Sequence, residues 1–567
     1  MVNMRTTSIF AALFIAGAAA IAPASAQAQT SGAPVRTLTI EEAVRLALDN
    51  NLGVQIARIN PQISDLSVAL ARAAWLPTFS TTVQGSNAST PNSSFLSGGA
   101  TGQSGISNGR LSSNIGLLQQ TPWGGSYQVG WDSTRSTTTN LFSNFSPQLQ
   151  SSLSLNIRQP LLRNFGIDNL RQQVIISEKN REISDIGVEQ TVATTSRAVR
   201  NAYWDLAYAI ASLAVQQQSL DLANESLRET NTRIQIGTTP PIDAVEAEAE
   251  VATREQAVIV AQEQIETAQD ALRSLIFNPS DPNFWTTRIE PAELPAFQPV
   301  TVDVDGAVRN ALQMRTDLLQ TRKSMEENDV NIKYFRNQTL PDVTASFDYG
   351  LTGLGGTQFV RGTGFPGPII GETQRSFGSV LGDLFGNQYP NWTLALNISY
   401  PLGHSQQEAN LARAQLQNSQ TLSQLRNAEL QVVTQVRNVA RQVQTNAKLV
   451  ESSRTSRALA EQRLDAEQKK LAAGTSTQFL VFQAQRDLAQ ARNTELNSVL
   501  SYNRSLVDLE TVQRAPVAGA GTATINTATS GTVGTGLTTT TTSTGVGTTT
   551  SPNQGGGALA NQGGGTQ

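Results

Sequence analysis

Residues 232–245 read Thr-Arg-Ile-Gln-Ile-Gly-Thr-Thr-Pro-Pro-Ile-Asp-Ala-Val and separate two long apolar repeats. Gly237 suits the left-handed position after a helix end, and Pro240 with Pro241 suits the start of the next helix. Apolar residues recur at every seventh position on both sides: Val192, Val199, Leu206, Leu213, Leu220, Leu227 and Ile234 before the break, and Ala244, Val251, Val258, Ile265 and Leu272 after it. Such a repeat keeps one narrow seam against a partner helix. The sequence therefore predicts an antiparallel coiled-coil hairpin, whose longer arm would span on the order of 100 Å.

The N-terminus predicts export. Arg5 precedes an apolar run, residues 9–21, and Ala24-Ser25-Ala26 is a small-residue cleavage pattern, so we expect residues 1–26 to be a signal peptide. The chain contains no cysteine, so no disulfide is predicted. Its net charge of −4 provides no electrostatic attraction to nucleic acid. After residue 26 the sequence contains no run of ~18 apolar residues, so no transmembrane helix is predicted. Insertion into a membrane would therefore require strands.

The chain repeats one plan. In the first half, a predicted helix starts after Thr39 and ends at Leu76-Pro77. Alternating strand patterns follow, and the last of them ends at Pro160-Leu161, directly before the coiled-coil hairpin. In the second half, a predicted helix over 304–337 ends at Leu340-Pro341. Alternating strand patterns follow at 343–349 and 392–400 and end at Pro401-Leu402. A predicted hairpin over 406–512 then turns at Gly474. Matching landmarks lie roughly 240–265 residues apart in the same order, which indicates a duplicated architecture.

We therefore expect a first structural repeat over 27–277, a Pro-rich connector over 278–303 and a second repeat over 304–513. The Gly- and Thr-rich residues 514–567 are predicted to be a disordered tail, because they offer almost no large apolar side chains to bury. Two segments rich in small polar residues or glycine, 84–112 and 350–389, are predicted to be exposed loops.

The predicted strands are too few to close a barrel alone, and an open sheet edge is not tolerated in hydrocarbon, so they imply assembly with other copies. Aromatic residues lie near the strand ends: Trp75, Trp123, Trp131, Tyr349, Trp392 and Tyr400. They fit either an interfacial girdle or ordinary turn packing.

From about residue 38 to 513 these features resemble the TolC-like outer membrane efflux proteins. The resemblance rests on the Leu38-Thr-Ile-Glu-Glu-Ala43 opening with Asn50-Asn51 shortly after it, the paired Leu-Pro and Pro-Leu junctions, the two Gly-Thr tips and the Tyr502–Leu506 ending. It implies an α+β membrane protein that acts as a homotrimer. A duplicated strand pair and long α-helical coiled-coil hairpin would form a twelve-stranded outer membrane β-barrel, with four strands from each copy, continuous with a periplasmic α-helical barrel. The segment from Ile115 to Trp131 exceeds that count; it could lengthen strands, add a hairpin or pack elsewhere.

The resemblance also implies partners: outer membrane lipid, a periplasmic adaptor protein and an inner-membrane pump. It assigns adaptor docking to the hairpin tips, Gly237 with Thr238 and Gly474 with Thr475. Helix termination explains the same glycines.

The resemblance places a pore constriction six and nine residues after the second tip glycine, at Leu480 and Gln483, flanked by Phe479 and Phe482. Some members carry acidic rings there, and this chain does not. We therefore expect a hydrophobic constriction that closes by dewetting. The equivalent positions of the first repeat are Asp243 and Glu246, acids that the helix dipole also favours at a helix start; the alternative of an acidic gate stays open.

No catalytic, metal or cofactor site is predicted. His404 is the only histidine, and one histidine makes neither a triad nor a metal site. Residues 362–367 match the glycine pattern of dinucleotide-binding loops but lack the flanking strand and helix. With no such site, the resemblance implies a non-enzymatic exit duct of an efflux pump or a type I secretion system. The alternative is a structural coiled-coil surface protein or adhesin.

Overall fold

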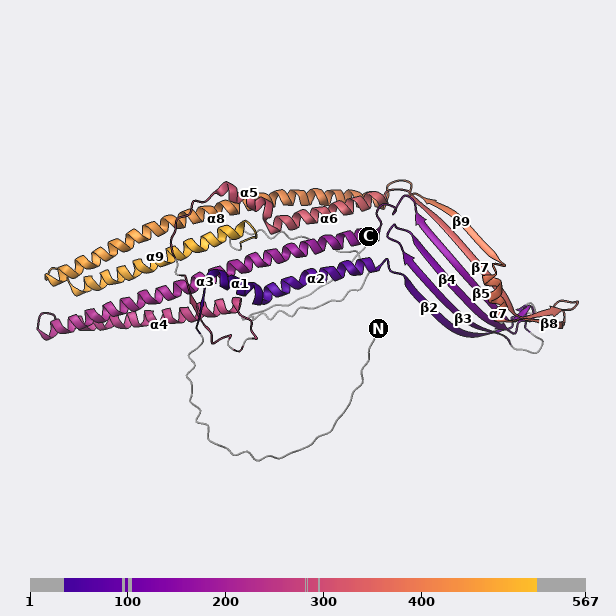
Figure 1. Ribbon diagram of the computed structural model, residues 1–567, viewed down its shortest axis with the longest axis horizontal. Coiled ribbons are helices and arrows are strands. Elements are labelled where there is room, and N and C mark those ends of the chain that lie inside the picture. The colour runs from indigo at the N-terminus through magenta and orange to yellow at the C-terminus, as the bar shows by residue number, and fades with distance from the viewer. Residues whose placement is uncertain are drawn as a thin grey trace, which may run out of the picture. The chain divides into compact units, whose positions relative to one another are not determined.

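The computed structural model describes residues 35–93, 97–99, 105–280, 282, 284–293 and 296–517. The predicted signal peptide and residues 518–567 of the predicted tail lie outside this part. In Figure 1 the long helices lie side by side and are followed by one twisted sheet at their end. No helix of the described residues combines the length and the apolar character needed to cross a membrane.

Both predicted coiled-coil hairpins are confirmed. The first consists of α3 (Asn169–Gln235) and α4 (Ile242–Ile276), and the second of α8 (Gln406–Ala472) and α9 (Gln478–Val512). Asp168 caps α3 by accepting a hydrogen bond from the Arg171 N–H, and Ser405 with Glu408 forms a capping box at α8. Within the predicted seam, Val199, Leu206, Ile265 and Leu272 are buried. Toward the tip the most buried residues are instead small, Ala223, Ser226 and Thr230, because α9 also packs against α3 there.

The helix predicted after Thr39 is wrong in one respect, because it is divided at Asn51. The structure has α1 (Ile40–Asn50) and α2 (Leu52–Ala73). The helix predicted in the second half is also divided, at Arg315, into α5 (Val304–Met314) and α6 (Thr316–Gln338), but there the Arg315 side chain does not cap the new helix. The Asn51 amide oxygen accepts hydrogen bonds from the N–H groups of Gly53 and Val54, at 2.9 and 3.3 Å. A side chain that caps a new helix competes with helix continuation, and apolar periodicity does not reveal it.

Two short strands hold the connector. β1 (Val35–Leu38) pairs in parallel with β6 (Arg288–Pro291). The buried Tyr203 of α3 donates its hydroxyl proton to the Leu38 carbonyl and accepts from the Glu293 N–H, both at 3.1 Å. Tyr502 of α9 does the same, donating to the Gln298 carbonyl at 2.8 Å and accepting from the Val300 N–H at 3.1 Å. The connector is therefore fastened to both hairpins.

Replacing Tyr203 with phenylalanine is expected to lower the free energy of unfolding by about 1–3 kcal/mol, because the variant leaves one carbonyl and one N–H without their partner. Chemical denaturation followed by circular dichroism measures this loss. Tyr208→Phe is the matched control: it lies on the same helix, and no hydrogen bond to its hydroxyl is found among the described residues. Equal stability of the two variants would contradict a stabilising role for the hydrogen bonds of the Tyr203 hydroxyl.

All but one of the predicted strand positions belong to one antiparallel sheet, which is larger than predicted. Among the described residues it has seven strands: β2 (Thr78–Pro91), β3 (Gly105–Gln120), β4 (Ser126–Thr138), β5 (Phe145–Pro160), β7 (Asp342–Arg361), β8 (Ile369–Arg375) and β9 (Pro390–Ser399). The order is β2-β3-β4-β5-β7, and β7 pairs with β9 along its first half and with β8 along its last part. The exception is Tyr400, which follows β9.

Both predicted loops are wrong in large part. Residues 84–91 continue β2 and residues 105–112 begin β3, paired in unbroken register from Thr78 opposite Leu118 to Pro91 opposite Gly105. Within 350–389, the structure has the second half of β7, then β8 and α7 (Phe377–Phe385). Small polar side chains are compatible with a strand when one of its faces contacts water, and composition alone does not distinguish the two cases. The segment around Ile115 to Trp131 adds a hairpin, β3–β4, to the sheet.

The helix α7 crosses the sheet over β7 and β5. It approaches the backbone of β7 closely at two glycines. A Cβ atom on Gly353 would lie 2.3 Å from the Val380 carbonyl oxygen, and one on Gly355 would lie 2.5 Å from the Val380 Cγ2 atom. These positions need glycine because α7 occupies the space of a side chain.

Candidate functional site at the hairpin tips

The two predicted tips have the same backbone geometry. Gly237 has φ +77° and Gly474 has φ +75°, the left-handed region that favours glycine. Each glycine N–H bonds back to the third residue before it, and each following threonine N–H bonds back to the fifth, as in a Schellman turn: Gly237 to Ile234, Thr238 to Arg233, Gly474 to Leu471 and Thr475 to Lys470, all at 2.9–3.0 Å. Each threonine hydroxyl donates to the same carbonyl as its own N–H. Helix termination at these glycines is therefore confirmed.

Gly474→Ala is expected to loosen the second tip locally. A Cβ atom at this position would meet nothing within 4 Å, so the penalty comes from the left-handed backbone alone, about 1–2 kcal/mol. Hydrogen exchange should show amides around residues 470–478 exchanging on the order of tenfold faster, with Gly474→Asn closer to the native protein.

Gly166→Ala is the control, because a Cβ atom there also meets nothing within 4 Å and its φ is not positive. Unchanged exchange in Gly474→Ala would mean that the turn is not set by this backbone conformation.

Both tips expose large apolar side chains. Around the first tip, Ile236, Ile242 and Val245 are 69, 61 and 59% exposed. At the start of α9, Phe479 is 55% and Leu480 39% exposed. Exposed apolar side chains at the tip of a helical hairpin are typical of a surface that binds another protein.

The structure separates the predicted constriction residues. Phe479 and Leu480 lie on the free surface, whereas Phe482 is 2% exposed and Gln483 is half-buried. Phe482 therefore packs inside the protomer. In the first repeat Asp243 is half-buried and Glu246 is exposed, both in the first turns of α4.

An ionic contact that the sequence analysis missed joins the two hairpins close to the tips. Glu250 of α4, with its side chain 7% exposed, accepts hydrogen bonds from Arg254 of the same helix at 2.6 and 2.8 Å through Oε1. Its Oε2 accepts from Arg486 of α9 at 3.0 Å. The Arg486 guanidinium also lies 5.9 Å from the Phe479 ring centroid, within cation–π range. The sequence shows the Glu250–Arg254 pair at i,i+4 spacing, but Arg486 is 236 positions away.

A second, uncharged link lies beside it. The buried Gln485 amide donates to the hydroxyl of Ser226 on α3 at 3.0 Å. The helix α9 is therefore bonded to both helices of the first hairpin, through consecutive residues. A buried carboxylate held by two guanidinium groups is costly to leave unpaired, so the relative position of the hairpins is coupled to these bonds.

The other residues singled out in the sequence do not join a site. The His404 side chain is fully exposed, with Nδ1 at 3.9 Å from a Glu408 carboxylate oxygen. Residues 362–367 form the turn between β7 and β8. The expectation that no strand precedes the glycine pattern is therefore wrong, but a strand and not a helix follows it.

Comparisons with known proteins agree with this architecture. A family model described as Outer membrane efflux protein matches residues 124–276 and 307–512. Solved structures with a similar fold include CusC, at 15% identity over 84% of this chain and 92% of that chain, with a TM-score of 0.59. The CmeC outer membrane channel of Campylobacter jejuni is similar at 16% identity over 84% and 85%, with a TM-score of 0.57. The outer membrane protein VceC of Vibrio cholerae is similar at 16% identity over 84% and 96%, with a TM-score of 0.56. A comparison with curated protein sequences gives no match.

Proposed function

The chain belongs to the outer membrane efflux protein family, and we propose that it forms a homotrimeric channel in the outer membrane that serves as the exit duct of a tripartite efflux pump. The helices extend from the membrane into the periplasm. Transport is passive, and an inner-membrane pump supplies the energy. The observation that carries this proposal is the joining of a sheet with one apolar and one polar face to two coiled-coil hairpins, which share buried polar contacts near their tips.

The two faces of the sheet suit a channel wall. One face carries large apolar residues that are exposed in the single protomer, among them Phe79, Trp392, Leu394, Leu396 and Ile398, each at least 58% exposed. The side chains of alternate residues point to the opposite face, where Asp132, Asn156 and Asp348 lie. Lipid outside and water inside require this division. Exposed aromatic residues at Trp123 and Tyr400 fit the interfacial layer.

The tips are the place where a periplasmic adaptor protein docks. The exposed apolar side chains of the first tip, Ile236, Ile242 and Val245, and the Schellman turns of both tips support this assignment. The periplasmic end is closed by an apolar ring of Phe479 and Leu480, and the Glu250–Arg486 contact holds the ring in place. Type I secretion would use the same duct with a different pump.

Conductance of the purified protein in planar bilayers tests the proposal. We expect an oligomer of three chains that inserts and gives a small, intermittent ion conductance. Failure to conduct despite verified insertion would contradict the channel, and a structural surface protein would then be the better reading.

A further inference from the structure

We propose that three copies close an eighteen-stranded barrel, in which each copy contributes six strands and the free edge of β9 pairs antiparallel with the free edge of β2 in the next copy. This inference rests on the proposed trimer. It departs from the twelve strands that the family resemblance implies, because the β3–β4 hairpin becomes part of the membrane wall.

The first support is an apolar row that crosses all six strands without a gap. The paired residues are Phe79, Leu117, Val129, Leu155, Tyr349 and Trp392, from β2 to β9. The neighbouring row on the same face reads Thr81, Ile115, Trp131, Leu153, Leu351 and Pro390. The only polar group of Trp131 is satisfied, since its indole N–H donates to the Ser151 hydroxyl at 2.8 Å. The hairpin β3–β4 thus carries the same lipid-facing surface as the other strands.

The second support is the opposite face of the same strands. The row between the two apolar rows reads Ser80, Gly116, Gly130, Ser154, Gly350 and Asn391, and the next reads Thr82, Asn114, Asp132, Ser152 and Thr352. Small and polar side chains line this face on β3 and β4 as on the other strands, which is typical of the wall of a water-filled pore.

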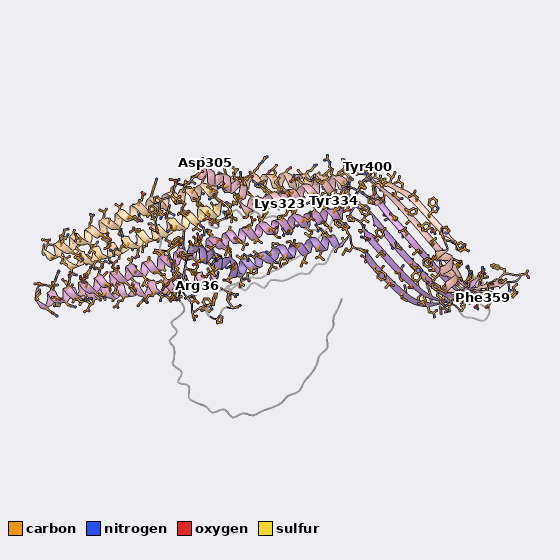
Figure 2. All side chains as sticks on the ribbon, in the orientation of Figure 1. Arg36, Asp305, Lys323, Tyr334, Phe359 and Tyr400 are labelled. Carbon is orange, nitrogen blue, oxygen red and sulfur yellow. The ribbon has the colours of Figure 1, made fainter. Side chains whose placement is uncertain are left out.

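The apolar face also has the height of a membrane. On β7 it runs from Val343 to Leu351, close to the ~9–11 residues that a tilted strand needs to cross hydrocarbon. Beyond Leu351 the same face carries Gly353 and Gly355, which α7 covers. In Figure 2, Tyr400 marks the end of the sheet near the helices, and Phe359 lies at the opposite end.

The third support is the pair of free edges. Within the described residues β2 pairs only with β3 and β9 only with β7, and nearly all residues of both edge strands are exposed. β2 leads away from the helices and β9 leads back to them, so neighbouring copies would meet in antiparallel orientation (Figure 1). Unpaired backbone groups are not tolerated in hydrocarbon, and an even strand number keeps every pair antiparallel.

The alternative of four strands from each copy would leave β4 as an edge. It would place β2 and β3 outside the barrel with Phe79, Ile115 and Leu117 still apolar. The sheet offers no break at which this could occur, because the register from β3 to β4 is continuous over its whole length. An eighteen-stranded barrel is wide enough to enclose an aqueous channel, so the outer mouth would be wider than in a twelve-stranded one.

Disulfide cross-linking tests the strand count, and the chain is suited to it because it has no cysteine. Thr81→Cys on β2 is combined in turn with Leu394→Cys, Leu396→Cys and Ile398→Cys on β9. Val129→Cys on β4 is combined with the same three β9 positions as the matched control, since both lie three residues into their strands on the apolar face. We expect covalent oligomers from at least one β2–β9 pair and from no β4–β9 pair.

A second measurement examines whether β4 spans the membrane. In the assembled channel, a membrane-impermeant maleimide should label Gln128→Cys, on the polar face, and not Val129→Cys, on the apolar face. Equal labelling of the two variants would overturn the assignment of this hairpin to the wall.

The outcomes separate the two proposals. A conducting trimer that cross-links between β4 and β9, or at none of the six pairs, would overturn the eighteen strands and leave the channel intact. Absence of both trimers and conductance would remove the proposed function itself.

Discussion

Arg486→Ala is expected to convert the small, intermittent conductance proposed for the native channel into a larger and steadier one. Arg486 bonds Glu250 across the two hairpins and lies over the Phe479 ring, so its removal breaks the ionic link between the tips and leaves the Gln485–Ser226 hydrogen bond beside it. Stability should change by less than about 1 kcal/mol, because Arg254 still neutralises Glu250. Single-channel recording of the variant beside the native protein measures the effect.

The matched control is Arg463→Ala. Arg463 also bonds an acid on α9, Asp487 at 2.6 Å, but this contact lies within the second hairpin and does not join it to the first. We expect native conductance from this variant. If both variants conduct alike, whether natively or more strongly, the contact between hairpins does not hold the closed state.

Glu250→Ala should behave differently from Arg486→Ala in stability. It leaves the nearly buried Arg254 guanidinium without its carboxylate, and the loss of one partner of a buried pair costs about 3 kcal/mol or more. Lower thermal stability together with raised conductance would show both roles of the carboxylate. Native thermal stability would indicate that Arg254 finds water in the assembled channel.

Patterns with many repeated positions were predictable from the sequence. Helical heptads continue over many turns on α3, so one misplaced residue does not alter the prediction, and the glycines at both tips are required by their left-handed backbone. The hairpins and their ends were therefore found. The division of two predicted helices at Asn51 and Arg315 was not predictable, because each division depends on one residue and its particular surroundings.

The strands β2 and β3 were missed in part for a different reason. One face of both strands carries mostly small polar side chains, and residues such as Ser107, Asn108 and Ser112 have the composition of a loop. The information that makes them strands lies in the neighbours with which they pair. The Glu250–Arg486 contact was missed for the same reason, since its partners meet only after both hairpins have formed.

Phe479→Ser combined with Leu480→Ser is expected to open the channel by wetting the constriction. Both side chains lie on the free surface at the start of α9, and a hydroxyl in place of each would remove the proposed apolar ring that excludes water. Phe482 is left unchanged, because it is 2% exposed and its loss would create a cavity costing about 3–5 kcal/mol. Large, steady conductance with native thermal stability is the expected result in planar bilayers.

Asp243→Asn with Glu246→Gln distinguishes the acidic gate from the apolar one. If charge closes the channel, this variant opens it and abolishes any block by divalent cations, while the serine variant stays closed. If dewetting closes the channel, the serine variant opens and this variant stays closed. The loss of the favourable dipole interaction of Asp243, the acid in the first turn of α4, costs only about 0.3–1 kcal/mol. Both apolar side chains, Phe479 and Leu480, are exposed, whereas Glu246 is exposed and Asp243 is half-buried, and this difference favours the second outcome.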